Sequence, residues 1–137
     1  MTRGFENSPE PGDIVWCRFP QRARDVPGPK PRPALVLTVT DYADGVVVRV
    51  AYGTSQRLDR LAGGEFAIRK LEQAAAYALA GLSFDTKFDL NHTFELPWNG
   101  HFFGVPPDAR HGQSWKLGSL HICMKKYLEA AARAVKR

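Results

Sequence analysis

Two apolar runs in the N-terminal half of the chain predict its central feature. Ala34 to Val39 and Val46 to Tyr52 are rich in Val and Leu, and the turn-forming pair Asp44-Gly45 separates them. This pattern predicts an antiparallel β-hairpin. Arg32 enters the first strand, and Thr54-Ser55-Gln56 leaves the second. Because antiparallel pairing brings these ends together, we expect a cation beside two hydroxyl groups, a combination suited to binding an anion.

Strict alternation between residues 82 and 91 predicts a strand with one buried face. The mostly apolar parity comprises Leu82, Phe84, Thr86, Phe88 and Leu90. The polar parity comprises Ser83, Asp85, Lys87, Asp89 and Asn91. The polar face therefore carries an acid, a base and an acid in a row, with side chains about 7 Å apart on an extended chain.

Shorter patterns predict the other strands. Ile14 to Phe19, with the large aromatic Trp16, and the alternating segment Glu65 to Arg69 are each expected to form a short strand. Alternation resumes over residues 94–98. Asn99-Gly100 then predicts a tight hairpin turn into a further strand over His101 to Val105.

Two segments have the apolar period of helices. Lys70 to Ala80 contains Leu71, Ala75 and Leu79 at this spacing, and Gly81 stands where the helix is expected to end. The C-terminal segment is predicted to form an amphipathic helix, with apolar side chains at Leu120, Met124, Leu128, Ala131 and Val135. Six or so short strands with two helices predict an α+β fold of mainly β character. We expect a small, strongly bent antiparallel sheet or barrel with the helices outside.

Two segments are predicted to lack regular structure. Residues 1–11 are expected to form a flexible arm, and residues 12–137 a single domain. From Pro20 to Pro33, five prolines and one glycine exclude a helix or strand. This segment is either a solvated basic connection or a substrate-binding loop.

The positive net charge of the chain is consistent with a nucleic-acid partner. The 137 residues carry a formal net charge of +5, which fits such a partner. Part of the excess lies at the C-terminus, where it complements a helix dipole. The other cluster comprises Arg18, Arg22, Arg24, Lys30 and Arg32.

Composition also limits the compartment and the metal chemistry. No run of about 18 apolar residues is present, so no membrane span is expected. The first residues lack the apolar middle of a signal peptide, which makes the cytoplasm the default expectation. Cys17 and Cys123 each lie in an apolar pattern and are expected to be reduced structural thiols. Two cysteines cannot by themselves supply the four ligands of a structural zinc site.

The remaining motifs favour chemistry without a cofactor. The four histidines lack ligand-type pairing, the serines lack a nucleophile elbow, and there is no phosphate-binding glycine loop. We therefore expect no metal and no cofactor.

The remaining polar groups suit metal-independent RNA cleavage, in which the ribose 2′-hydroxyl attacks the neighbouring phosphate. A base and an acid move protons, and cations or hydroxyls stabilise the charged phosphorane. The alternative is that Lys87 and its neighbouring acids only form ion pairs on a solvated sheet face.

Several motifs together resemble the MazF/PemK family of toxin endoribonucleases. They are GDIVW at residues 12–16, RPALVL at residues 32–37, TSQ at residues 54–56, DTKFDL at residues 85–90 and LGSL at residues 117–120. The resemblance spans roughly residues 12 to 135. It implies a small SH3-like barrel, a homodimer, and cleavage of single-stranded mRNA to a 2′,3′-cyclic phosphate and a 5′-hydroxyl. It also implies a cognate antitoxin that covers the site.

The resemblance further implies which residues act. Arg32 matches the family's phosphate-binding or acid/base Arg, and Thr54 or Ser55 its transition-state hydroxyl. Lys87 and Asp89 match a basic residue and an Asp on the later strand, although Lys lacks the bidentate fork of Arg. Some relatives use a His in the first loop, and this loop has none. The candidate RNA-binding residues are Arg18, Arg22, Arg24, Lys30, Gln56 and Asp85.

Two alternatives stay open at this stage. The chain is either an active endoribonuclease or a non-catalytic barrel that binds a nucleic acid or a protein. The aromatic residues Phe94, Trp98, Phe102 and Phe103 either stack on RNA bases or belong to the core or a dimer interface.

Overall fold

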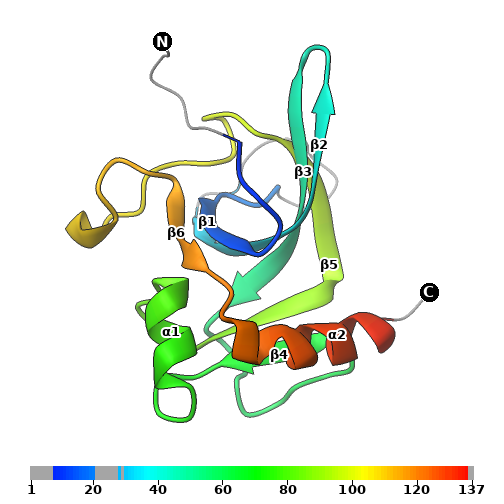
Figure 1. The fold of residues 1–137 in the computed structure, drawn as a ribbon, viewed down its shortest axis with the longest axis vertical. Coiled ribbons are helices and arrows are strands. Elements are labelled where there is room, and N and C mark those ends of the chain that lie inside the picture. The colour runs from blue at the N-terminus through cyan, green and yellow to red at the C-terminus, as the bar shows by residue number, and fades with distance from the viewer. Residues whose placement is uncertain (1–7, 21–27, 29, 136–137) are drawn as a thin grey trace.

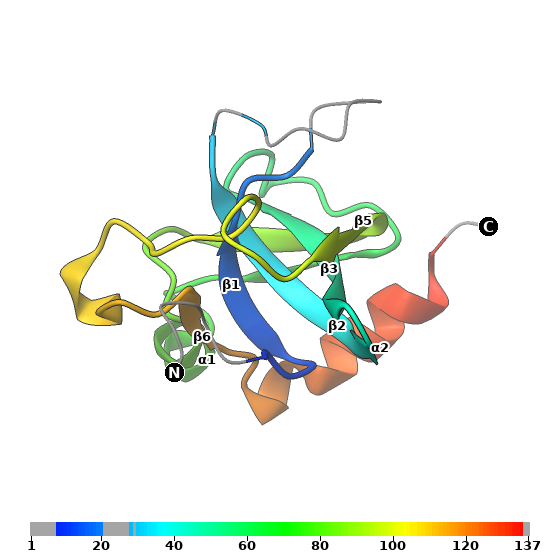
Figure 2. The same cartoon turned by 90° about the horizontal axis from the view of Figure 1, so that it is seen from above.

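In the part of the chain that the structure describes, a curled antiparallel sheet of six strands packs with two helices (Figures 1 and 2). The computed structural model describes residues 8–20, 28 and 30–135. The strands are β1 (Asp13–Cys17), β2 (Arg32–Tyr42), β3 (Gly45–Thr54), β4 (Glu65–Ile68), β5 (Thr86–Pro97) and β6 (Lys116–Ser119), in the order β4-β5-β3-β2-β1-β6. The helices are α1 (Ala74–Ala80) and α2 (Lys125–Arg133), with short 3₁₀ turns η1 (Ala109–His111) and η2 (Ile122–Met124). This architecture confirms the predicted mainly β, α+β small barrel.

The predicted hairpin is formed by β2 and β3, and it is one of the two longest pairings in the sheet. Tyr42 pairs with Gly45, so the turn residues are Ala43 and Asp44, one position earlier than predicted. At the other end, a Cβ on Gly53 would lie 2.3 Å from the carbonyl oxygen of Pro33. Glycine therefore lets the start of β2 approach the end of β3 closely. This approach brings the two predicted anion-binding ends together.

Strand β5 bends sharply in its middle. Its pairing with β3 jumps from Ala51–Thr93 to Tyr52–Asp89, which leaves residues 90–92 as extra residues on β5. Such a bulge increases the local bend and redirects side chains. The alternation predicted this strand, but β5 begins at Thr86 rather than at residue 82.

Burial along this segment corrects two sequence-based expectations. The alternation predicts that Phe84 is buried, yet Phe84 precedes β5 and is 71% exposed. The alternative of ion pairs on a solvated sheet face is also wrong about exposure, because Lys87 and Asp89 are only 7% and 8% exposed. Lys87 is enclosed because its ammonium group bonds two carbonyls in the chain leading into β4 and the Glu65 carboxylate on β4, which no local pattern reports.

Both helices form, but α1 turns a different face inward. It begins at Ala74 instead of Lys70, and Leu71 is 92% exposed while Ala76 and Ala80 are buried. Gly81 ends α1 in the left-handed conformation, as predicted, with φ +70°. The C-terminal helix follows its predicted stripe, with Met124 and Ala131 buried and Leu120, Leu128 and Val135 packed against the core.

The predicted hairpin at Asn99-Gly100 is wrong. Residues 101–105 make one isolated bridge, between Phe103 and Cys17, and the Phe103 N–H donates to the Asn99 carbonyl within a turn. The sixth strand is instead β6, which pairs with β1. Four residues that include a glycine gave no recognisable strand pattern.

Side chains on the two faces of the sheet pack in two separate hydrophobic cores. One lies between the sheet and the helices and contains Ile14 and Phe88, and the other, on the opposite side, contains Val15, Cys17 and Phe103. In Figure 1, α2 lies along β4 and α1 beside β6. Burial raises the pKa of the Cys17 thiol, which fits a structural role, whereas Cys123 is exposed, contrary to prediction. No helix in the described part of the chain has the length and apolar character needed to span a membrane.

Candidate functional site

The two ends of the β2–β3 hairpin carry the first part of the site. Arg32 begins β2, and its guanidinium carbon lies 5.5 Å from the centre of the Tyr52 ring on β3. Arg32 makes no ion pair with any residue the structure describes. Thr54 and Ser55 line the same cleft as Arg32, so the structure brings this predicted trio together.

This cleft has a volume of about 320 Å³. One wall comes from the ends of β2 and β3, and the others come from Ser83, Phe84 and Thr86 and from side chains within residues 106–111. The backbone N–H of Gln56 donates to the Thr54 hydroxyl at 3.1 Å, which fixes that side chain. Lys30 also lines the cleft, whereas Gln56 is exposed and does not.

The predicted catalytic residue Lys87 lies outside this cleft. It pairs with Thr54 in the sheet, but its ammonium group donates to the carbonyls of Arg57 and Arg60 at 3.0 Å and to Glu65 at 3.1 Å. An ammonium group has three donors, so all of them are used. Lys87 therefore joins the chain after β3 to β4, and no donor is left for a substrate.

Asp89 also lies outside the cleft, but its partner faces solvent. Its carboxylate accepts from the Asn91 N–H at 2.9 Å and contacts His92 Nδ1 at 2.6 Å. The His92 side chain is 69% exposed, and its ring lies 6.5 Å from that of Tyr52. A carboxylate on one ring nitrogen fixes the orientation and tautomer of an imidazole.

Tyr52 thus contacts two polar groups of the site: Arg32 lies over its ring, and His92, which is paired with Asp89, meets the ring edge-on. His92 was not identified from the sequence. The only signal was its i, i+3 spacing to Asp89, which brings two side chains together here because the β5 bulge turns the chain.

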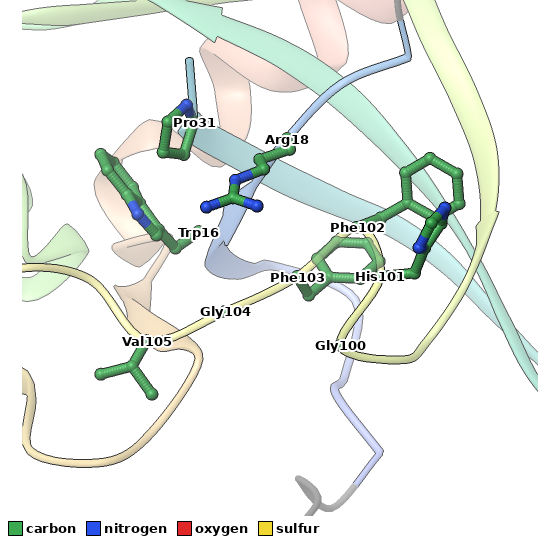
Figure 3. A pocket seen from close by; sticks show the side chains of 9 residues that line it. All are labelled: Trp16, Arg18, Pro31, Gly100, His101, Phe102, Phe103, Gly104 and Val105. Atoms are coloured by element: carbon green, nitrogen blue, oxygen red, sulfur yellow. The ribbon is translucent and has the colours of Figure 1, made fainter. Parts of the chain in front are cut away.

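The predicted RNA-binding residues are divided between several places. Asp85 accepts from the Lys70 N–H at 2.8 Å and does not line the cleft. Arg18 lines a second pocket of about 190 Å³, and Figure 3 shows its guanidinium directed toward Trp16. Trp16 and Pro31 line both the pocket and the cleft, so the two adjoin. Arg22 and Arg24 lie outside the described residues.

Two further titratable groups in the cleft come from the C-terminal part of the chain. The Arg110 N–H donates to Asp108 and, with the Arg110 charge, holds the pKa of that carboxyl below its usual range. Asp108 therefore stays ionised at neutral pH. His111 lines the cleft as well. Within residues 8–20, 28 and 30–135, no three His, Cys, Asp or Glu side chains gather as metal ligands would.

Comparison with known proteins identifies one family. A family model described as the PemK-like, MazF-like toxin of type II toxin–antitoxin systems matches residues 10–90. No curated protein matches the chain. The matched region contains Arg32, Thr54, Lys87 and Asp89, and it ends before His92 and before the 106–111 wall of the cleft.

Proposed function

Because the chain belongs to the PemK-like, MazF-like toxins of type II toxin–antitoxin systems, we propose that it is a metal-independent endoribonuclease acting on single-stranded mRNA. The observation that carries the proposal is the position of Arg32. Its guanidinium has no carboxylate partner in the described structure, and it adjoins both the Thr54-Ser55 hydroxyls and the Tyr52 ring that contacts His92.

The proposed reaction uses the substrate's own nucleophile. The ribose 2′-hydroxyl attacks the adjacent phosphorus, the bond to the 5′-oxygen breaks, and a 2′,3′-cyclic phosphate and a 5′-hydroxyl form. Arg32 and the Thr54 and Ser55 hydroxyls stabilise the negative charge that develops on the phosphorane. A cation that is not neutralised by a carboxylate is suited to this role.

Proton transfer is assigned to the exposed imidazole. His92 exchanges a proton with the 2′-hydroxyl or the leaving oxygen, since imidazole is the side chain best suited to this at neutral pH. Asp89 acts as its positioning residue through the 2.6 Å contact. Lys87, whose donors are all used, supports the site by holding residues 57–60.

The family also implies an antitoxin partner and an RNA substrate. We propose further that a cognate antitoxin covers the Arg32 surface and that the active form is a cytoplasmic homodimer. The alternative, a barrel that binds RNA or a protein without cleaving, is favoured by the engagement of Lys87 in structural bonds.

The test is cleavage of mixed-sequence single-stranded RNA in EDTA, with analysis of the product ends. The wild type is expected to yield cyclic phosphate and 5′-hydroxyl ends. Arg32→Ala is expected to cleave about 10²–10³-fold more slowly. Arg49→Ala is the matched control, because Arg49 is exposed elsewhere on β3 and pairs with Glu95. No cleavage by the wild type, or equal cleavage by Arg32→Ala, would overturn the proposal.

A further inference from the structure

We propose that the cleft beside Arg32 binds the base of the nucleotide next to the scissile phosphate, with Phe84 as its stacking surface. This inference rests on the RNA cleavage proposed above and names the part of the substrate that the cleft takes. Its volume of about 320 Å³ lies at the small end of the range for ligand sites in proteins.

Phe84 is the first reason for a base. Its side chain is 71% exposed at the wall of the cleft, although the other residues of the same parity, Leu82, Thr86, Phe88 and Leu90, are buried. Trp16 and the Pro106-Pro107 pair provide further flat or apolar surfaces in the same cleft. Nucleobases present flat apolar faces, and an aromatic side chain binds such a face without regard to base identity.

The positive charges of the cleft indicate how a bound nucleotide is oriented. Lys30 and Arg32 lie with the Thr54 and Ser55 hydroxyls toward the end of the hairpin, and neither cation has an ion pair among the residues described. Asp108, on the opposite wall, is ionised, but its carboxylate is paired with the Arg110 guanidinium at 2.8 Å. The unpaired positive charge of the cleft therefore lies on the Lys30 and Arg32 side, which attracts the phosphate, and the base occupies the remaining apolar space.

His111 supplies a polar group at the wall where the edge of a base would lie. Its Nε2 is buried and is the one buried side-chain nitrogen or oxygen in the described structure that lacks a hydrogen-bond partner. Such orphan groups are rare in native proteins and destabilise them. The ring has room because Gly81 follows α1: a Cβ there would lie 3.0 Å from His111 Cε1. A turn of the imidazole toward the cleft lets Nε2 bond the edge of a bound base.

The far wall of the cleft lies outside the part that matches the family. Residues 106–111 and Leu117 come after residue 90, where the match ends. The stacking residue and the phosphate-binding residues belong to the matched part. The wall that meets the edge of the base is therefore supplied by a segment that the family model does not describe.

The test measures binding of a short single-stranded 2′-O-methyl RNA by fluorescence anisotropy. This RNA lacks the attacking hydroxyl, so its binding does not depend on cleavage. Phe84→Ala is expected to bind about 5- to 150-fold more weakly than the wild type, and Phe84→Tyr is expected to retain binding. Leu71→Ala is the matched control, since Leu71 is 92% exposed and does not line the cleft.

Thermal unfolding of Phe84→Ala is expected to match the wild type, because the side chain is largely exposed. Equal binding by Phe84→Ala and the wild type overturns the base-stacking proposal, whatever the cleavage activity. If Phe84→Ala loses binding but the wild type cleaves no natural RNA, the stacking site stands and the nuclease assignment falls.

Discussion

Two carboxylates hold basic side chains of β5 that differ in their exposure to solvent. Lys87 pairs with Glu65 at 3.1 Å, and the side chains are 8% and 11% exposed. His92 pairs with Asp89 at 2.6 Å, and here the carboxylate is again 11% exposed but the imidazole is 69% exposed. Lys87 and Asp89 are two residues apart and share one face of the strand.

This difference in exposure distinguishes a pair with a structural role from a pair that can act on a substrate. The ammonium of Lys87 has three acceptors and no access to a substrate. The imidazole of His92 uses one ring nitrogen on Asp89, and no bond of the other nitrogen is found within the described residues. A sequence motif cannot distinguish the two, because both present an ionisable residue near an acid.

The largest effect is expected from Lys87→Met. Removing the cation leaves the Glu65 carboxylate and two carbonyls without their donor in a nearly buried place. Breaking a buried pair on one side costs about 3–5 kcal/mol of unfolding free energy. Urea unfolding measures it, with Lys70→Met as the control, because Lys70 is exposed and its side chain makes no bond in the described structure. A change of less than 1 kcal/mol for Lys87→Met would contradict the structural role.

His92→Ala is expected to lower the cleavage rate without lowering the unfolding free energy, the opposite of Lys87→Met. Stability should change little, since the side chain is largely exposed, while single-turnover cleavage falls about 100-fold, or about 2.7 kcal/mol on the barrier. His121→Asn is the control, because the His121 side chain only caps η2 and Asn keeps an acceptor for that bond. A loss of stability without loss of cleavage would make His92 a structural residue.

Asp89→Asn is expected to give an intermediate effect. The amide keeps one acceptor oxygen for the Asn91 N–H but removes the charge that orients His92. Loss of one charge-assisted hydrogen bond corresponds to about 1.5 kcal/mol, or about a tenfold slower cleavage. The rate should stay above that of His92→Ala, and a rate below it would mean that Asp89 acts on the substrate directly.

The smallest effect on stability and cleavage is expected from Glu95→Gln. The Arg49–Glu95 pair also lies partly on β5, and its side chains are 43% and 63% exposed. Exposed pairs contribute about 0–1 kcal/mol. Unfolding free energy and cleavage should both stay close to those of the wild type. A larger loss would show that exposure alone does not rank the pairs on this strand.

Local pattern was sufficient for the central strands of the sheet and for half of the site. The runs at residues 34–39 and 46–52 alternate or stay apolar over a full strand, and so the hairpin and the meeting of Arg32 with Thr54 and Ser55 were predictable. The edge strand β6 was not, because four residues carry too little pattern.

The rest depended on contacts between distant segments. The ammonium donors of Lys87 are used because they bond the carbonyls of Arg57 and Arg60, which are about 30 positions earlier in the chain. The exposure of His92 depends on the bulge where β5 leaves its register with β3. No property of the residues themselves reports such distances, so the sequence assigned chemistry to Lys87 and overlooked His92.

The most direct measurement is chemical rescue of His92→Ala by free imidazole in the cleavage assay. The rate should rise with imidazole concentration, because the small base replaces the missing side chain beside Tyr52. Lys87→Met, assayed while folded, should not respond. Cleavage by His92→Ala at the wild-type rate, or rescue of Lys87→Met instead, would contradict the assignment of proton transfer to the exposed pair.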